Sequence, residues 1–369
     1  MPRNATAPSH YALTLLSRLL FQGDANVADS SAAARLKQQV LCLRGDDFNA
    51  MLMLAQSNHV IVRGLEVFLD IVREAHDGER TRWAQTALDE ERSRIAVAIH
   101  FLHEICGAFN EAGLDVTVIK SLDHWPDLGS DLDLYTNAAP ELVMQLMRNR
   151  FGAEIAQRSW GDRLASKWNF MVPGLPEAVE IHIGRLGQTG EQSSFAASLH
   201  GRSVSVLRGD YRFPVTSPSD RITISTLQRM YRHFYFRLCD VVDTAALADS
   251  RGIDYDDLLA SAQAAGIWEG MATYMVIVSD YVKSFRGRGI DMPRFVADAA
   301  RFGGSEIYFG KGFLRVPILP QSARLYGSQL AGVLGRGELD SGARLSLLPW
   351  LATAAVLGQK LTGSDKGIW

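Results

Sequence analysis

The chain has 369 residues, of which 47% are hydrophobic and 21% are charged, and its formal net charge is −3. This length is sufficient for two or three domains with a large apolar core. The weakly acidic balance argues against nucleic acid as the main partner, because proteins that bind it usually carry clustered basic residues.

The sequence does not indicate export or membrane insertion. The N-terminus lacks the basic start, the long apolar run and the small-residue cleavage site of a secretory signal. Residues 345–358 form the longest apolar run near the C-terminus, but Pro349 interrupts it and it is too short to span a bilayer. Cys42, Cys106 and Cys239 form no CxxC pair, which is typical of free thiols in a reducing compartment. We therefore expect a cytoplasmic protein with no membrane partner.

Helical periodicity dominates the first part of the chain. Apolar residues recur at helical spacing in residues 59–75 and 93–112. Gly113 is expected to end the long helix, since glycine tolerates the left-handed conformation that follows many helices. These patterns predict a helical N-terminal region over residues 1–112.

From Val116 onward the periodicity changes to that of short strands. Two hairpins are predicted, because Pro-Gly-Leu-Pro separates one pair of strands and Arg208-Gly209-Asp210 separates another. The predicted elements are strands at 116–119 and 131–135, a helix at 140–150, and hairpin strands at 167–172, 178–184, 204–207 and 211–215. Together they predict one α+β unit over residues 113–216, with a small sheet that is antiparallel or mixed.

The rest of the chain is predicted to be mainly helical. Ser217-Pro218-Ser219-Asp220 has the composition of a helix start, and one long helix is expected over residues 221–250. Further predicted elements are helices at 254–265, 267–286 and 292–302, an extended pair within 307–317, more helix after 321 and a loose end at 362–369. We assign residues 217–369 to a C-terminal domain.

Asp131 and Asp133 are the first candidate site residues. In an extended strand, residues two apart point to the same side, so both carboxylates share a face while Leu132 and Leu134 turn to a core. Neighbouring carboxylates repel each other unless a cation lies between them, and carboxylate oxygens suit Mg²⁺. The alternative interpretation is a polar strand edge or an Asx turn after Gly129-Ser130.

Glu180 and His182 share one face of the strand Val-Glu-Ile-His-Ile, whose apolar residues take the other face. This alternation favours a site, although an exposed strand glutamate is the simpler alternative. His182 either contacts a phosphate, orients a carboxylate, or is an ordinary histidine under the sheet.

Lys120 and Ser121 follow the first strand, where the chain turns into a short helix. Backbone amides at such a position bind anions, and Lys120 would add positive charge for phosphates. A solvated lysine at a strand end is the alternative. Gly129 and Ser130 would offer a close backbone approach and a hydroxyl to the same phosphates.

These motifs, taken in order, resemble the nucleotidyltransferase superfamily that includes DNA polymerase β. The similarity is greatest to its branch of uncharacterised bacterial nucleotidyltransferases, which have a Lys-Gly strand end, then Ser-Asp-Ile-Asp-Leu, then a strand reading acid-x-His. The corresponding residues here are 118–121, 129–134 and 179–182, followed by His233 and Asp240, and the resemblance covers roughly residues 50–250. Ser121 departs from the pattern, since glycine is expected there.

The resemblance implies an α+β polymerase β-like core with helical regions on both sides. It further implies a metal-dependent enzyme that moves an NMP group from an NTP, with ATP as the expected donor, to a hydroxyl on a small molecule or a protein. Mg²⁺ is the expected ion and Mn²⁺ the alternative. The implied catalytic residues and metal ligands are Asp131, Asp133 and Glu180, with Glu180 as ligand or general base. The implied nucleotide-binding residues are Lys120, Ser121, Gly129, Ser130 and His182.

Two rival functions remain open from the sequence. A nucleotide-binding or protein-interaction module could have kept this fold and lost catalysis, as the change to Ser121 suggests. A metal-dependent hydrolase would instead use Asp123, His124 and Asp127 together with His182, although their spacing matches no regular ligand pair. The stretch 229–243 either faces the cleft with its arginines or is an amphipathic helix with ordinary ion pairs.

Overall fold

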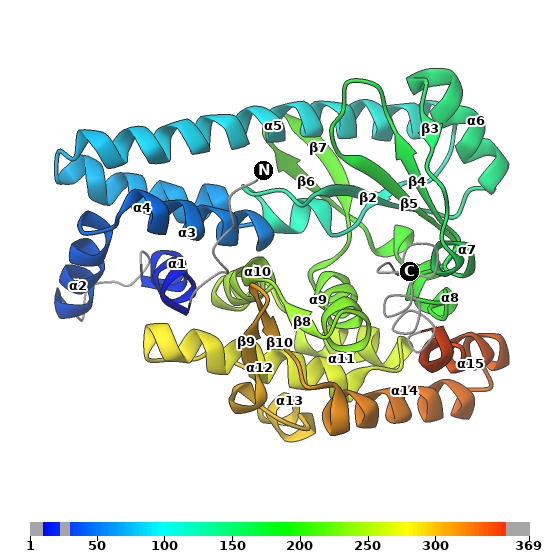
Figure 1. Ribbon diagram of the computed structural model, residues 1–369. Helices are drawn as coiled ribbons and strands as arrows, with labels where there is room; N and C mark the ends of the chain where they lie inside the picture. The colour runs from blue at the N-terminus through cyan, green and yellow to red at the C-terminus, as the bar shows by residue number, and fades with distance from the viewer. Residues whose placement is uncertain (1–9, 23–29, 352–369) are drawn as a thin grey trace.

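The computed structural model describes residues 10–22 and 30–351. Figure 1 shows a long helix, α5, along the top of the molecule, with the main sheet below one end of it and the C-terminal helices at the bottom. The N-terminal helices are α1 (His10–Gln22), α2 (Ser30–Leu41), α3 (Gly45–Ser57), α4 (Ile61–Glu74) and α5 (Gly78–Glu111). Gly113, with φ +68°, follows the end of α5, so the predicted stop is confirmed.

The main sheet is mixed and has seven strands in the order β3-β4-β5-β2-β1-β7-β6. Its strands are β1 (Thr117–Val118), β2 (Asp131–Thr136), β3 (Glu154–Ile155), β4 (Lys167–Met171), β5 (Ala178–Ile183), β6 (Val204–Arg208) and β7 (Tyr211–Val215). Both predicted hairpins are confirmed, because β4 pairs with β5 and β6 with β7 in antiparallel fashion. The α+β class is confirmed as well. The short helices among these strands are η1 (Ser121–His124), α6 (Pro140–Phe151), α7 (Trp160–Leu164), α8 (Ser193–Ser198) and η2 (His200–Arg202).

Strands β2 and β5 lie side by side in parallel, and their register decides where the polar residues meet. Asp133 pairs with Glu180, and Tyr135 with His182. Leu132, Leu134, Val179 and Ile181 are fully buried on the opposite faces, with exposed fractions of 0%. Period-2 alternation therefore holds in both strands, and burial of the aliphatic residues fixes which face carries the acids.

The C-terminal part begins as predicted, but one of its predicted helices differs in the structure. Ser217 caps α9, since its side chain accepts a hydrogen bond from the Asp220 amide. The single helix predicted over 221–250 is wrong. A π-helical turn, η3 (Leu227–Arg232), ends it, Phe234 adopts a φ of 54°, and the short strand β8 (Tyr235–Phe236) pairs with β10. The apolar spacing of residues 221–250 is compatible with a helix. Pairing of Tyr235–Phe236 with the distant strand β10 interrupts that helix.

The other C-terminal elements agree with the predicted pattern, including the extended pair within 307–317. They are α9 (Pro218–Thr226), α10 (Leu238–Asp249), α11 (Tyr255–Ala264), α12 (Trp268–Arg286), α13 (Arg294–Ala299), η4 (Gly304–Glu306), β9 (Tyr308–Gly310), β10 (Phe313–Arg315), η5 (Ile318–Ser322), α14 (Ala323–Gly335) and α15 (Leu339–Ser346). The end predicted to be loose, 362–369, lies outside the described residues.

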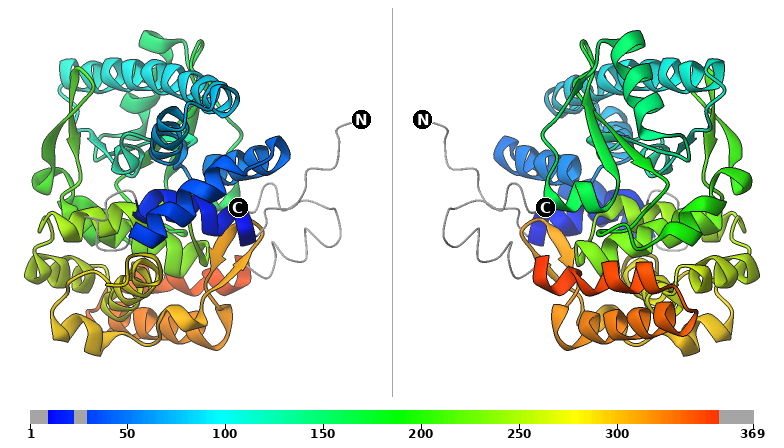
Figure 2. Two further views of the ribbon diagram at one scale, coloured as in Figure 1. Left: turned by 90° about the vertical axis from the view of Figure 1, so that its left-hand side faces the viewer. Right: turned by 90° about the vertical axis from the view of Figure 1, so that its right-hand side faces the viewer.

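One contiguous hydrophobic core runs through all three predicted regions. Helix α1 packs against α12, as the views in Figure 2 also show. At this contact Phe21 stacks on Phe285 with ring centroids 6.1 Å apart, and the Ser17 hydroxyl lies 2.6 Å from that of Tyr281. The predicted boundaries thus separate stretches of different secondary structure that share one interior.

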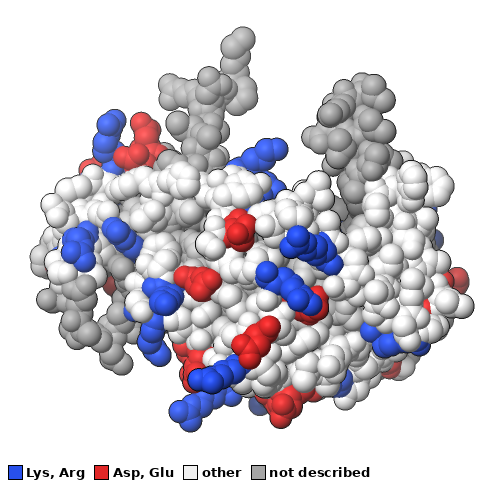
Figure 3. All heavy atoms as spheres, turned by 90° about the horizontal axis from the view of Figure 1, so that it is seen from below, with Lys and Arg blue, Asp and Glu red and all other residues white. Residues whose placement is uncertain are grey.

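Charged side chains of both signs are interspersed on the face shown in Figure 3, among broad uncharged areas. The described residues visible on this face form no continuous basic patch of the kind that nucleic acid requires. Among residues 10–22 and 30–351, no helix combines the length and the apolar character needed to cross a membrane.

Asn58 ties the N-terminal helices to the C-terminal part. Its amide nitrogen donates to the carbonyls of Leu54 and Gly312, at 2.9 and 3.0 Å, and its amide oxygen accepts from the Leu238 amide at 3.0 Å. Because Asn58 is only 1% exposed, no water replaces these partners easily.

We predict that Asn58→Ala lowers the free energy of unfolding by about 1–3 kcal/mol, since it leaves buried polar groups without partners. Urea denaturation followed by circular dichroism measures this loss. Asn49→Ala is the matched control, because Asn49 is exposed on the neighbouring helix α3. Equal losses in the two variants would show that the bridging hydrogen bonds contribute nothing.

Candidate functional site

A cavity of about 190 Å³ lies between the main sheet and the segment that follows α9. Residues of both signs line it. The sheet and the η1 turn contribute Lys120, Ser121, His124, Gly129, Ser130, Asp131, Asp133 and Glu180, and the C-terminal segment contributes Gln228, Arg229, Arg232, His233, Tyr235 and Arg237. His59, from the turn before α4, completes the lining. Such a cavity has the charge pattern needed for a ligand that carries both anionic groups and a cation.

Asp133, Glu180 and His182 form the innermost group of the site. One ligand atom from each lies within 4.8 Å of the others, which is close enough for a shared metal ion. The His182 Nε2 atom is 2.8 Å from Glu180 Oε1 and 3.8 Å from Asp133 Oδ1. Asp131 lies on the same face of β2 but is exposed, at the outer part of the cavity.

Lysines already neutralise the inner acids. The Lys120 ammonium contacts Asp133 directly and lies 3.4 Å from Glu180 Oε1. Lys167 reaches the other oxygen of Glu180, with Nζ 2.9 Å from Oε2, and also Asp162 Oδ1 at 2.8 Å. Both carboxylate oxygens of Glu180 are therefore engaged inside the protein.

Lys167 was missed by the sequence reasoning, although a signal was present. It is the first residue of a predicted hairpin strand, and antiparallel pairing places it opposite His182. A basic residue facing an acidic strand across a hairpin is a common way to compensate charge.

Neighbouring groups shift the pKa values of Glu180 and Asp131 in opposite directions. Burial would raise the pKa of Glu180, but Lys120, His182 and Lys167 together hold it well below its usual range. The pKa of Asp131 is raised by partial desolvation, and by Asp133 and Glu180 nearby. A carboxylate with such a low pKa is a weak base, so these charges argue against Glu180 as the general base.

The backbone at Lys120 is strained. Its φ of 62° and ψ of −56° belong to a rare γ-turn, and the Ser121 amide closes this turn on the Ile119 carbonyl at 2.6 Å. A non-glycine residue in this conformation costs about 1–3 kcal/mol, and such positions cluster at functional sites.

Ser121 supports strand β2 rather than presenting its donors to the cavity. Its hydroxyl accepts from the Asp133 amide at 2.6 Å and donates to the Asp131 carbonyl at 3.2 Å. Its own amide is used in the γ-turn. The predicted phosphate-binding role of Ser121 therefore has no free donor in this arrangement.

Gly129 and Ser130 line the cavity. The Gly129 carbonyl accepts from Arg94 Nη1 at 3.3 Å, and the Ser130 hydroxyl donates to Asp131 Oδ2 at 3.3 Å. A methyl group at Gly129 would meet only ordinary contacts, so a close approach does not require glycine there.

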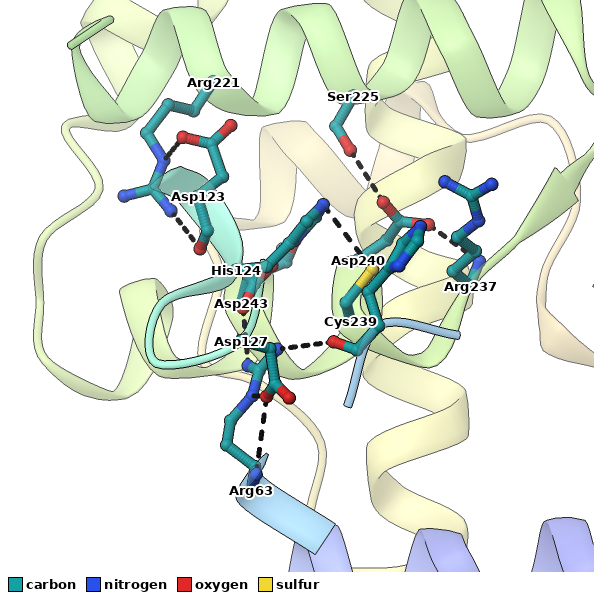
Figure 4. Close-up of polar contacts among 12 residues, drawn as sticks. Arg63, Asp123, His124, Asp127, Arg221, Ser225, Arg237, Cys239, Asp240 and Asp243 are labelled. Atoms are coloured by element: carbon teal, nitrogen blue, oxygen red, sulfur yellow. Dashed lines mark hydrogen bonds and ion pairs between the residues drawn. The ribbon is translucent and has the colours of Figure 1, made fainter. Parts of the chain in front are cut away.

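A largely buried polar network holds the η1 turn and the residues that follow it (Figure 4). Arg63 of α4 donates to Asp127 Oδ2 at 2.7 Å and to Asp243 Oδ1 of α10 at 2.6 Å. His124 completes the network, with Nδ1 2.5 Å from Asp243 Oδ2 and Nε2 3.7 Å from the Cys239 sulfur. The network thereby connects all three predicted regions at the base of the site.

The positions of Asp123, His124, Asp127 and His182 do not support the hydrolase alternative. Asp123 pairs with Arg221 at 2.8 Å, Asp127 pairs with Arg63, and His124 belongs to a group with Cys239 and Asp243. His182 belongs to a separate group with Asp133 and Glu180. The four residues of that hypothesis are not brought together.

Three arginines of the stretch 229–243 line the cavity: Arg229, Arg232 and Arg237. Arg229 is buried and pairs with Asp240 at 2.7 Å. Burial lowers the pKa values of His59 and His233, and the neighbouring arginines lower them further. Both histidines are therefore neutral at pH 7, and the arginines carry the positive charge of this wall.

No protein-family model matches the chain, and no curated protein matches it significantly.

We predict that Ser121→Ala lowers the free energy of unfolding by about 1–3 kcal/mol, because it leaves the buried Asp133 amide without an acceptor. Ser130→Ala is the control, since its hydroxyl is exposed and bonds only the neighbouring Asp131. Thermal and urea unfolding of the two variants measure the difference. A loss no larger than the control's would contradict the strand-supporting role.

We predict that Arg63→Met lowers the free energy of unfolding by about 3–5 kcal/mol, because Asp127 would be left buried without its cation and Asp243 would keep only His124. Equilibrium urea denaturation measures the change. Arg92→Met is the control, since Arg92 forms an exposed pair with Glu66. An equally small effect in both variants would contradict the structural role of the network.

The network also predicts a pH dependence of stability. Burial would lower the pKa of His124, but Cys239 and Asp243 raise it well above its ordinary value. Its contribution is therefore complete below the unfolded pKa of about 6.5 and is lost as the pH rises through the folded value.

We predict that the wild type loses stability above about pH 6.5 and that His124→Gln flattens this loss. Urea denaturation midpoints from pH 6 to pH 9 measure the effect, with exposed His200→Gln as the control. Parallel profiles for the wild type and His124→Gln would rule out protonated His124 as the source.

Proposed function

We propose that the chain is a metal-dependent nucleotidyltransferase with a polymerase β-like core. It would transfer an NMP group from an NTP, with ATP as the expected donor, to a hydroxyl on a small molecule or protein. The observation that carries this proposal is the pairing of Asp133 with Glu180 on adjacent parallel strands. Asp131 lies on the same face, in a cavity that arginines also line.

The donor set suits one Mg²⁺ or Mn²⁺ ion at the outer part of the cavity. Asp131 and Asp133 offer carboxylate oxygens on one face of β2, which are the ligands that these ions prefer. A bound ion would neutralise charge on the transferring phosphoryl group. The inner position, between Asp133 and Glu180, fits an ion less well, because Lys120 already lies there.

The remaining residues have roles that follow from charge and exposure. Arg232 and Arg237 would bind the triphosphate and attract it into the cavity, since they carry the charge of the wall. The acceptor oxygen would attack the α-phosphorus while the bond to the β-phosphate breaks and pyrophosphate leaves. Asp131 and Asp133 would hold the ion and Glu180 is paired with lysines, so the hydroxyl proton would pass to solvent water.

We predict that one of the four NTPs binds the wild type only in the presence of Mg²⁺, and that Asp131→Asn/Asp133→Asn abolishes this binding. Asp133→Asn alone should lower kcat/KM for NMP transfer at least about 100-fold, because it removes several kcal/mol of metal-dependent stabilisation. Isothermal titration calorimetry and pyrophosphate release measure the two effects.

The matched control is Asp46→Asn/Asp47→Asn, which makes the same charge change at exposed positions of α3. Unchanged binding in the control shows that net charge is not the cause. If no NTP binds the wild type, the transferase proposal is abandoned.

A catalytically inactive module that binds nucleotide is the second candidate. Two observations favour it: Lys120 occupies the inner position, and both donors of Ser121 are used inside the protein. Such a module would bind an NTP and release no pyrophosphate with any acceptor. Pyrophosphate release from the wild type, absent in Asp133→Asn, would exclude this candidate.

A further inference from the structure

The inner position of the site has the spacing of a metal centre but contains a lysine. Ligand atoms of Asp133, Glu180 and His182 lie within 4.8 Å of one another. The Lys120 ammonium contacts Asp133 and is 3.4 Å from Glu180, so it lies where an ion shared by these carboxylates would bind. Two positive charges cannot share this space without strong repulsion.

The backbone holds Lys120 at this position. The γ-turn between Ile119 and Ser121 fixes its φ at 62°, and the Ser121 hydroxyl fastens the turn to the Asp133 amide. The same serine therefore positions both the lysine and the aspartate that it contacts. The Lys120 side chain is only 13% exposed, so it is part of the cavity floor rather than a free surface lysine.

While Lys120 is present, 3.4 Å from Oε1, neither oxygen of Glu180 is open to an additional ion. Its Oε1 atom lies 2.8 Å from His182 Nε2, and its Oε2 atom lies 2.9 Å from Lys167 Nζ. Lys167 is in turn fixed by Asp162 at 2.8 Å. The charge of Glu180 is thus balanced entirely by side chains of the protein, whereas Asp131 has no cation within contact distance among the described residues.

Sites for phosphoryl transfer commonly hold two divalent ions. We propose that Lys120 replaces one of them, so that Asp131 and Asp133 would hold a single ion. This inference rests on the proposed function. In the transfer step, the acceptor oxygen forms its bond to the α-phosphorus and its proton passes to solvent water, while the bond to the β-phosphate breaks and pyrophosphate takes the electron pair. The Lys120 ammonium would stabilise negative charge beside Glu180 in the way that a second ion otherwise would.

The stoichiometry of bound metal tests this proposal independently of activity. Each protein is saturated with the α,β-methylene analogues of the four NTPs, which resist transfer, and Mn²⁺ is counted by electron paramagnetic resonance. We expect one Mn²⁺ per wild-type ternary complex. We expect two in Lys120→Met, because the ligand atoms around the vacated position lie within 4.8 Å. The spectrum should be that of a spin-coupled pair, because Asp133 would be a ligand of both ions.

Three further variants make the count decisive. Lys120→Arg keeps the charge and should keep one Mn²⁺, and Lys37→Met, which removes an exposed lysine, should also keep one. Lys120→Gln, which removes the charge with less change of shape, should bind two and replaces Lys120→Met if that variant fails to fold.

The outcomes separate the two proposals. Two Mn²⁺ ions in the wild type, or one ion in folded Lys120→Met and Lys120→Gln, would overturn the role of Lys120 and leave the transferase proposal intact. No ternary complex with any analogue would overturn both proposals.

Discussion

The repulsion between two carboxylates on adjacent strands is the constraint on which the site depends. Parallel pairing of β2 with β5 places Asp133 directly beside Glu180, and the buried aliphatic residues on the opposite faces prevent either strand from shifting by one residue. Such a pair is stable only with compensating cations. Lys120 from the turn and Lys167 from β4 supply that compensation from two sides.

Contacts around the paired acids also hold the strained backbone at Lys120. A lysine in a γ-turn of positive φ persists only where its surroundings determine its position. Here the Ser121 hydroxyl connects the turn to β2, and the Arg63 network fixes the end of η1 from below. The geometry of the acids is thus set by contacts with the N-terminal and C-terminal helices as much as by the sheet itself.

Local patterns predicted much of the fold and the acidic face of the site. Alternation in β2 and β5 identified which side of each strand carries Asp133 and Glu180, and turn residues identified both hairpins. The broken helix could not be predicted, because the partner of β8 is β10, far along the chain. The His124–Asp243 contact joins residues 119 positions apart, and no local pattern carries such information. The role of Ser121 was missed for a related reason, since its hydroxyl serves a neighbouring strand.

The pairing of β8 with β10 has a consequence for how the protein can be divided. Tyr235 and the arginines beside it reach the cavity because the chain leaves the helix and runs along a strand that forms after residue 307. The strand pair β9 and β10 is therefore part of the scaffold of the cavity. A fragment that stopped before Tyr308 would retain every acidic residue of the site and still lose the support of its basic wall.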